Sequence, residues 1–402
     1  MDSKELSDAF PDNQMKEMKM AFENSEFLQA ADNIKRSLVN INSIPLNIAV
    51  TGESGSGKST FINVIRGLGD EDEGSAKTGV VQTTMVATPY SHPRHRNVKY
   101  WDLPGIGTDS FRPNEYLKLV NLEQFDFFVI VTSERFKDCH IQLAQAINSM
   151  GKKFYFVRNK IDADLNASRT LRKSSYNEDQ ILKEIRNNCV KRLFESGIMF
   201  PRVFLLSCLE LEKYDFCLMQ KTLENELPSH KKHVFLLSLP NTCFQALENK
   251  RIAFRNQIWK HALVSAAKTS LLSPGLLFDA DVDFLISTMQ EYKETFGLDH
   301  ISLKCLAKTF DKDVHDLRSV IQSELVLKEI TYDLVVSLLN RPQLTEVARK
   351  IINYAAVTVP MMGNMAAGGV AFGTAYWLLY SFLKDVAEDS RRVLSKALEN
   401  TL

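Results

Sequence analysis

A glycine-rich loop between an apolar run and a helical pattern constrains this chain more than any other feature. Leu46–Val50 predicts a buried strand, and Phe61–Arg66 predicts a helix. The loop between them fits GxxxxGKS, whose backbone N–H groups converge on phosphate oxygens at a helix N-terminus. Lys58 is expected to reach the outer phosphates and Ser59 to ligate Mg²⁺. The residues predicted to bind phosphate are Gly52, Glu53, Ser54, Gly55, Ser56, Gly57, Lys58, Ser59 and Thr60.

Short apolar runs alternate with helical patterns between residues 46 and 230. The runs are Leu46–Val50, Val98–Leu103, Phe127–Thr132, Phe154–Val157 and Val203–Ser207. This alternation is typical of an α/β fold with a mostly parallel sheet and helices on both faces. Helical patterns such as 242–269 dominate residues 231–402, and two short amphipathic helices in residues 1–45 need an apolar partner. We predict an α/β domain over 46–230 and an all-α domain formed by 1–45 and 231–402.

The next strong strand ends in the sequence Asp102-Leu103-Pro104-Gly105. Asp102 fits the acidic residue that holds Mg²⁺, usually through water, in nucleotidases with a phosphate-binding loop. The N–H of Gly105 is expected to face the terminal phosphate. DxxG is a weak signal alone, but its place after the loop and at a strand end strengthens it.

A second polar cluster, Asn159-Lys160-Ile161-Asp162, follows the strand Phe154–Val157. A carboxylate at Asp162 accepts hydrogen bonds from the ring N–H and the exocyclic amine of guanine. Adenine lacks these donors and would leave the carboxylate unpaired, so the cluster favours GTP over ATP. Asn159 is expected to hold the loops around the base, and the Lys160 stem to cover its face. Ser207, at the end of a later strand, is a candidate contact to the guanine carbonyl.

The polar segment Gly69–Thr84 lies between the phosphate loop and Asp102 and predicts a mobile switch region. Thr78, Thr83 and Thr84 are all candidates to close over Mg²⁺ and the γ-phosphate, and spacing does not choose among them. Ile106 follows Gly105, where many GTPases place a glutamine that orients the attacking water. Hydrolysis is therefore expected to be very slow, or to use a group from elsewhere.

Composition excludes several other classes of protein. The 402 residues carry 49 basic and 49 acidic side chains, so no global field attracts nucleic acid or an anionic membrane. The six cysteines form no CxxC pair, and the histidines form no ligand pattern, so His92, His95, His140 and His233 are interpreted as surface or structural. The charged first residues predict no secretory signal, and a cytoplasmic location is expected.

One stretch of 33 residues, Ile351–Leu383, contains no charged side chain. An apolar run of this length is the usual indication of a membrane-spanning helix. Here it is interrupted by asparagines, a proline and four glycines, which favour a buried helical hairpin. Both interpretations, the buried hairpin and a membrane-contacting element, stay open.

Together the motifs resemble one known family, the immunity-related GTPases, an interferon-inducible group. The similar runs are GESGSGKSTFINVIRGLG, AKTGVVQTTM, TPYSHP, WDLPGIGT, FDFFVIVTSERFK and KKFYFVRNKIDADL. The resemblance covers nearly the whole chain. It implies a Ras-like domain set on a helical domain built from both chain ends. It also implies GTP-driven self-assembly on intracellular membranes and a role in cell-autonomous defence.

Lys58 places the chain in the class of this family with lysine in the phosphate loop. Members of that class dimerise through the nucleotide face, and a group of the opposite protomer aids hydrolysis. The residues that match this face are Glu53, Thr78, Asp102, Arg135 and Lys137. The resemblance also makes related GTPases possible partners.

Three departures from the family pattern bear on function. Gln82 stands where a relative carries glutamate, which puts the hydrolytic rate in doubt. Asn159 replaces a frequent threonine and should not harm guanine binding. Asp2 excludes the lipid anchor that some relatives attach to a glycine, so membrane contact would have to come from the helical domain, with residues 351–383 as the candidate. Peripheral association with intracellular membranes is the expectation.

The leading hypothesis is a GTP hydrolase that self-assembles, with Lys58, Thr78, Gln82 and Arg135 as catalytic residues and Ser59, Thr78 and Asp102 as metal ligands. The alternative is a nucleotide-gated binding module with negligible turnover, which Ile106 and Gln82 permit. A third hypothesis is an integral membrane GTPase anchored by residues 351–383.

Overall fold

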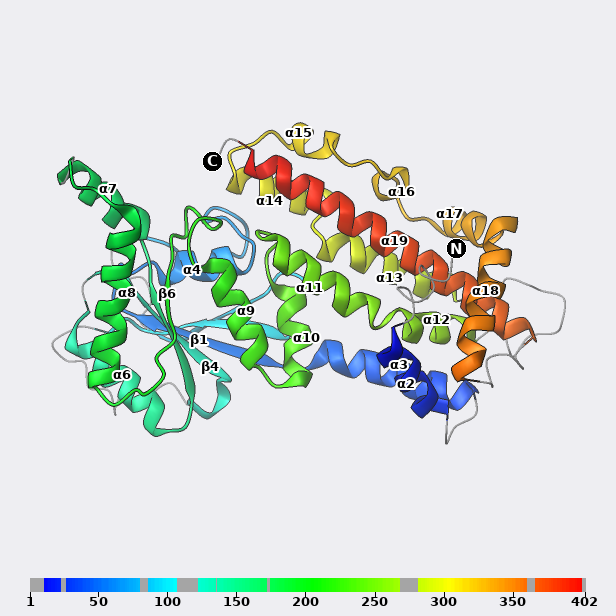
Figure 1. Ribbon diagram of the computed structural model, residues 1–402, viewed down its shortest axis with the longest axis horizontal. Helices are drawn as coiled ribbons and strands as arrows, with labels where there is room; N and C mark the ends of the chain where they lie inside the picture. Colours follow the sequence, from blue (N-terminus) through cyan, green and yellow to red (C-terminus); the bar gives the residue numbers. More distant parts are fainter. Residues whose placement is uncertain are drawn as a thin grey trace. The chain divides into compact units, whose positions relative to one another are not determined.

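The computed structural model describes residues 11–22, 27–79, 86–106, 122–134, 136–171, 174–267, 281–359 and 366–399. The chain divides into two units (Figure 1). One unit is Asn42–Ala246, and the other joins Met1–Ile41 to Leu247–Leu402. The predicted boundary between residues 230 and 231 falls inside helix α10, Ser229–Ser238, which belongs entirely to the first unit.

The first unit is built on a six-stranded sheet in the order β2-β3-β1-β4-β5-β6. All neighbouring strands pair in parallel except β2, which is antiparallel to β3. The strands are β1 Leu46–Gly52, β2 Thr88–Ser91, β3 Val98–Asp102, β4 Phe127–Thr132, β5 Lys153–Arg158 and β6 Val203–Leu205. The predicted α/β fold with a mostly parallel sheet is thus confirmed, with the five apolar runs as its parallel strands.

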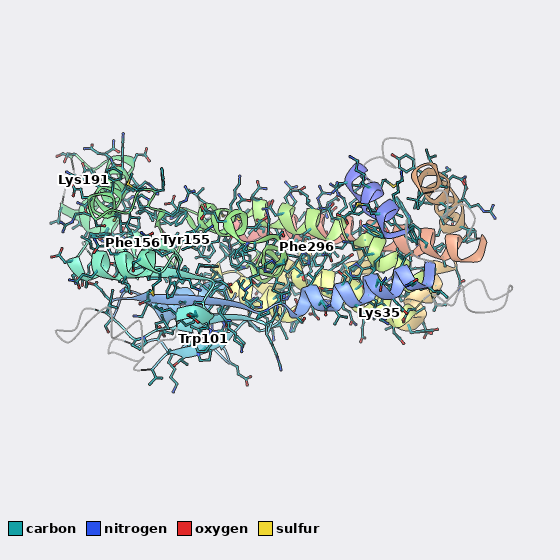
Figure 2. The ribbon with its side chains drawn as sticks, turned by 90° about the horizontal axis from the view of Figure 1, so that it is seen from below. Lys35, Trp101, Tyr155, Phe156, Lys191 and Phe296 are labelled. Atoms are coloured by element: carbon teal, nitrogen blue, oxygen red, sulfur yellow. The ribbon has the colours of Figure 1, made fainter. Side chains whose placement is uncertain are left out.

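Both faces of the sheet are covered by helices, which explains why the central strands β1 and β4 are buried along most of their length. On β5, Phe156 packs in one cluster with Leu143 of α6 and Leu193 of α8. Its neighbour Tyr155 points to the other face, where its hydroxyl donates to Glu226 of α9 (Figure 2). The helices are α4 Lys58–Ile65, α6 Asp138–Ser149, α7 Ile161–Leu171, α8 Glu178–Glu195, α9 Phe216–Glu226 and α10 Ser229–Ser238, with the short 3₁₀ helix η1 Leu122–Gln124.

The carboxyl ends of the parallel strands lie at one edge of the sheet. The chain leaves β1 for β3 on one side and returns to β4 on the other, so the strand order reverses at β1. Ligands of open α/β sheets bind in the crevice at such a reversal. The predicted phosphate loop and Asn159 follow strands at this edge, and Asp102 is the last residue of β3 there.

The second unit is entirely helical in its described residues. Its longest helix, α19, packs on α12, α13 and α15 to α18. The helices are α2 Asp12–Phe22, α3 Phe27–Ser43, α11 Phe244–Arg255, α12 Ile258–Ala267, α13 Val282–Thr295, α14 His300–Thr309, α15 Val314–Ser319, α16 Glu324–Leu327, α17 Tyr332–Leu339, α18 Pro342–Thr358 and α19 Ala366–Leu398. The pattern predicted as one helical stretch over 242–269 is thus two helices, α11 and α12.

The N-terminal segment packs into this unit through a buried glutamine. Gln14 of α2 donates from Nε2 to the carbonyl of Arg255 at 2.8 Å. Its Oε1 accepts from the hydroxyl of Tyr376 in α19 at 3.4 Å. Lys260 forms an ion pair with Glu17 at 3.2 Å. The two ends of the chain therefore build one helical domain, as predicted.

The uncharged stretch 351–383 spans the end of α18 and the first half of α19, with residues 360–365 outside the described part. These two helices pack on each other at Gly373. A Cβ atom at position 373 would lie 2.7 Å from the carbonyl oxygen of Ala348. Within the described residues, no helix combines the length and the apolar character needed to cross a membrane.

Replacing Gly373 by valine should destabilise the helical unit. The added side chain meets backbone, which cannot rotate away, so we expect the free energy of unfolding to fall by about 1–3 kcal/mol. Urea denaturation measures this change. Lys384→Val places a valine at an exposed position of the same helix and is the control. Valine has a higher helix propensity than glycine, so propensity alone would not destabilise Gly373→Val. Equal losses in the two variants would contradict the close crossing.

Candidate functional site

The loop from Gly52 to Gly57 joins β1 to α4 and has a backbone that only glycine accommodates at its ends. Gly52 has φ 141°, and a Cβ there would lie 1.9 Å from the carbonyl oxygen of Val131. Gly57 has φ 91° at the N-cap of α4, where a Cβ would lie 2.5 Å from Nδ2 of Asn159. Because α4 begins at Lys58, its unpaired N–H groups face the loop, as a phosphate-binding helix requires.

The Lys58 side chain is buried and turns back over the loop. Its ammonium donates to the carbonyl oxygen of Glu53 at 2.8 Å and to that of Gly52 at 3.3 Å. Burial lowers the pKa of Lys58, and the carboxylates of Asp102 and Glu53 oppose the shift. A bound phosphate would give this cation a charged acceptor, which hydrogen-bonds more strongly than a neutral carbonyl.

Oxygen ligands suited to Mg²⁺ stand beside the lysine. The Ser59 hydroxyl donates to Oδ2 of Asp102 at 2.9 Å, and the Asp102 side chain is buried. A hydroxyl and a carboxylate are the hard donors that Mg²⁺ binds, with water completing its shell. These two residues fit a magnesium site. Thr60 instead donates to Asp70 at 3.5 Å, away from this pair.

The segment after Asp102 lies against the loop. The N–H of Ile106 donates to the carbonyl of Gly52 at 3.0 Å, and its side chain is buried. A Cβ at Gly105 would lie 3.2 Å from the backbone nitrogen of Ser54, so the glycine permits this approach. The side chain at position 106 is thus part of the core and cannot orient a water molecule.

The predicted base-binding loop is hydrogen-bonded to the phosphate loop. Asn159 donates from Nδ2 to the carbonyl of Ser56 at 3.0 Å. Lys160, with φ 59°, donates from Nζ to the carbonyl of Gly55 at 2.9 Å. Asp162 lies half-buried in the first turn of α7. The same turn is fixed to β5 by an ion pair of 2.6 Å between Arg158 and Asp164.

Ser207 belongs to the same loop cluster. The N–H of Ile161 donates to the carbonyl of Leu206 at 3.1 Å, which joins the end of β6 to the base-binding loop. The Ser207 hydroxyl is buried and accepts from the N–H of Leu209 at 3.2 Å. It therefore stabilises the local turn.

Two of the predicted catalytic residues, Gln82 and Arg135, lie outside the described residues, as do Thr83 and Thr84. Thr78 is described and is exposed. Of the predicted catalytic set, the structure therefore places Lys58 in the phosphate loop and Thr78 on the surface of the segment that follows α4.

Asn63 of α4 and Arg66, the C-cap residue that follows this helix, were not predicted as site residues, yet they hold the start of the segment after α4. The buried Asn63 amide donates to the carbonyl of Ala76 at 3.0 Å and accepts from its N–H at 2.6 Å. It also donates to Asp70 at 2.8 Å. Arg66 donates to the carbonyls of Gly74 and Ser91. An asparagine and an arginine within the otherwise apolar run Phe61–Arg66 were the available signal, because polar groups that fold into a core need hydrogen-bond partners.

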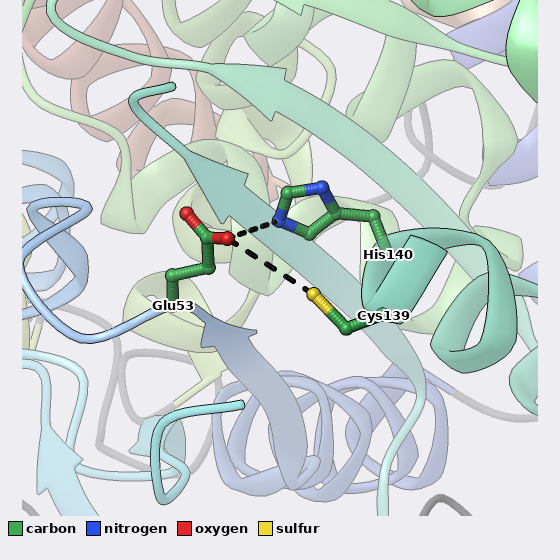
Figure 3. Close-up of side chains that lie close together, drawn as sticks. All are labelled: Glu53, Cys139 and His140. Carbon is green, nitrogen blue, oxygen red and sulfur yellow. Dashed lines mark hydrogen bonds and ion pairs between the residues drawn. The ribbon is translucent and has the colours of Figure 1, made fainter. Parts of the chain in front are cut away.

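Glu53 is the one acidic side chain of the loop, and it is turned toward the start of α6 (Figure 3). Its Oε1 lies 2.9 Å from Nζ of Lys137, 3.5 Å from Nε2 of His140 and 4.0 Å from Sγ of Cys139. Sequence patterns did not predict this cluster, because Glu53 and His140 are far apart in the chain. His140 was interpreted as a surface or structural residue, and its position next to the phosphate loop was not predicted.

Glu53, Cys139 and His140 are near enough to hold a metal ion, but the hydrogen bonds of the histidine argue against it. Nδ1 of His140 accepts from the N–H of Lys137 at 3.0 Å, so the neutral ring carries its proton on Nε2, which faces Glu53. A ligating Nε2 would have to lose that proton. The Lys137 ammonium, already on Oε1, would also repel a cation.

The strand order and these loops define a P-loop guanine-nucleotide-binding protein. A phosphate loop follows β1, an acidic residue ends β3, and an NKxD cluster follows β5. A model of the interferon-inducible GTPase (IIGP) family matches residues 12–397. The chain belongs to this family, which confirms the resemblance seen in the sequence motifs.

Relatives with known names match over most of the chain. Interferon-inducible GTPase 5 of Rattus norvegicus is 42% identical over 96% of this chain and 83% of its own length. Interferon-gamma-inducible GTPase 10 of Mus musculus is 40% identical over 90% and 84%. Immunity-related GTPase family M protein 1 of Mus musculus is 31% identical over 76% and 70%.

The stability of the nucleotide-binding unit should fall in mild acid because of His140. Burial, partly opposed by Glu53, lowers the His140 pKa from 6.5 to about 4, with Lys137 and Arg158 lowering it further and Glu134 opposing. Between pH 6.5 and 4 the unfolded chain therefore binds a proton that the folded chain does not. The free energy of unfolding falls over this window by about 3 kcal/mol from this residue.

Denaturant titrations at pH 7 and pH 4.5 test this expectation. His140→Asn should lose less stability than the wild type between the two pH values, and His315→Asn, on an exposed part of α15, should behave as the wild type. Equal pH dependence in the wild type and His140→Asn would contradict the assignment.

Proposed function

We propose that this chain binds GTP with Mg²⁺ and hydrolyses it to GDP and phosphate. The observation that carries the proposal is the convergence of the phosphate loop, the Ser59–Asp102 pair and Asn159–Asp162 at one edge of the sheet. Membership in a family of GTPases supports it. Asp162 is proposed to accept from guanine, Asn159 and Lys160 to shape the base pocket, and Ser207 to border it.

In the proposed reaction, water attacks the γ-phosphorus in line with the leaving oxygen. Lys58 and the backbone N–H groups of the loop stabilise the negative charge that develops on the phosphate oxygens. Ser59 and Asp102 would hold Mg²⁺, which neutralises further charge when bound. Thr78 is proposed as an additional ligand from the switch segment.

The attacking water has to be oriented by a group other than Ile106, whose side chain is buried in the core. We propose that Gln82 and an interface cation, Arg135, supply this function when two molecules meet at their nucleotide faces. Self-assembly in the GTP state, association with related GTPases, peripheral binding to intracellular membranes and a role in interferon-induced defence complete the proposal. The family resemblance supports these four features.

The buried Ile106 also favours a second candidate, a nucleotide-gated binding module with negligible turnover. Such a protein would bind its partner in one nucleotide state without the need for hydrolysis. The two candidates differ in whether phosphate is released at high protein concentration.

GTP hydrolysis per molecule should rise with protein concentration if catalysis is shared between protomers. Lys58→Ala should abolish turnover because it removes the main phosphate cation, and Arg135→Ala should leave only the basal rate. Phosphate release at several protein concentrations measures both. Lys221→Ala and Arg96→Ala, two exposed cations of the same unit, are the matched controls. A flat concentration profile would refute shared catalysis, and intact GTP after hours would favour the binding module.

Asp162→Asn should change the base preference from guanine to xanthine. The amide cannot accept two hydrogen bonds from guanine, but it can donate to the additional carbonyl of xanthine. We expect GTP affinity to fall ~100-fold or more and XTP affinity to rise. Competition against a fluorescent nucleotide measures both. Asp179→Asn, exposed in the first turn of α8, should change neither. An unchanged preference in Asp162→Asn would remove Asp162 from the base site.

A further inference from the structure

A carboxylate inside a phosphate-binding loop is an electrostatic problem. The Glu53 side chain is 7% exposed, and it stands in the loop that has to receive a polyanion. Like charges repel more strongly in a partly buried site than in water, so an uncompensated Glu53 would oppose nucleotide binding. Its backbone carbonyl also accepts from Lys58, so this one residue contacts the phosphate-binding cation directly.

The start of helix α6 supplies a positive charge that balances the Glu53 carboxylate. The Lys137 ammonium lies 2.9 Å from Oε1 of Glu53 and 2.8 Å from Oε2 of Glu134. Hydrogen bonds to Glu134 and then Glu53 raise the pKa of Lys137, so it stays charged at neutral pH. The Glu134 carboxylate is 64% exposed, so water also solvates it, whereas the buried Glu53 depends on its protein partners.

His140 adds a fixed dipole on the buried side of the carboxylate. The ring is fully buried, and its Nε2 makes no hydrogen bond but points at Oε1 of Glu53 from 3.5 Å. Its Nδ1 is held by the Lys137 N–H, which closes a capping box at the start of α6. One turn of helix therefore presents both a cation and an N–H group to the same oxygen.

We propose that Lys137 and His140 are positioning residues that neutralise Glu53 and hold its side chain against α6, so that the loop accepts nucleotide phosphates. This inference rests on the proposed GTP binding and adds a role within one molecule. Without Lys137, the Glu53 carboxylate competes with phosphate for the Lys58 ammonium and repels the nucleotide. The loss should be larger for a triphosphate than for a diphosphate because the triphosphate carries more charge.

A double-mutant cycle tests the proposal. Lys137→Met, Glu53→Gln and the double variant are compared with the wild type for binding of fluorescent GDP and a fluorescent non-hydrolysable GTP analogue. The protein is kept dilute, so that only one molecule surrounds each nucleotide. Lys137→Met should weaken analogue binding roughly tenfold and GDP binding less. In the Glu53→Gln background the same substitution should change either affinity less than ~2-fold.

The outcomes separate this inference from the proposed function. If Lys137→Met weakens nucleotide affinity by the same factor in the Glu53→Gln background as in the wild type, the inference is overturned. Lys137 would then act on the nucleotide directly and not through Glu53. An unchanged affinity in Lys137→Met would overturn it too. If the wild type binds neither nucleotide, the proposed function itself fails. Lys153→Met removes an exposed ion pair with Glu226 at the start of β5 and should leave both affinities unchanged.

Two substitutions of His140 distinguish the role of Nδ1, which accepts from the Lys137 N–H, from that of Nε2, which faces Glu53. Asparagine keeps an acceptor for the Lys137 N–H but has no donor near Glu53, whereas glutamine can place its amide near Nε2. The proposal expects His140→Asn to weaken analogue binding ~2-fold or more and His140→Gln to stay close to the wild type, with thermal unfolding confirming that both fold. Equal affinities in the two variants would assign His140 to packing alone.

Discussion

The approach of the β1 backbone to β4 at Gly52 is the constraint on which the site depends. The chain has to turn out of the sheet where the Val131 carbonyl leaves no room for a Cβ atom, and it does so with a positive φ. That turn places the loop over the carboxyl edge of the sheet and starts α4 at Lys58. Asp102 reaches the loop because β3 pairs in parallel with β1, and Asn159 reaches it because β5 pairs in parallel with β4. The carboxyl ends of these strands therefore lie at the same edge of the sheet.

Around this turn, the loop is held by backbone and side-chain groups of the segments that follow β3, β4 and β5. Asn159 and Lys160 bond to its outer carbonyls, Ile106 bonds to Gly52, and α6 holds Glu53. These partners fix the loop before any ligand arrives, which lowers the ordering cost of binding. Lys58 alone uses contacts that a phosphate can replace.

Much of this arrangement follows from local patterns in the sequence. The five parallel strands fall on predominantly apolar runs, and the phosphate, Asp102 and base motifs each have fixed spacing. The edge strand β2 was missed because Thr88–Ser91 is largely exposed and has no apolar run. The division of residues 242–269 at Asn256 and Gln257 was missed because neither residue is a strong helix breaker. The contacts of Glu53 with Lys137 and His140 were not predicted, because these residues are far apart in the sequence and only the fold brings them together.

The hydrogen bonds between Asn63 and Ala76 limit how far the neighbouring threonine can travel. Both backbone groups of Ala76 are fixed to α4, so Ala76 is an anchored point from which Thr78 is reached by two residues. Two residues of extended chain span at most about 7 Å. Thr78 therefore has to stay within that distance of Ala76, and so close to the helix that begins with Lys58. Two hydrogen bonds of the buried Asn63 side chain thus link the position of Thr78 to that of Lys58, because Asn63 and Lys58 belong to the same helix.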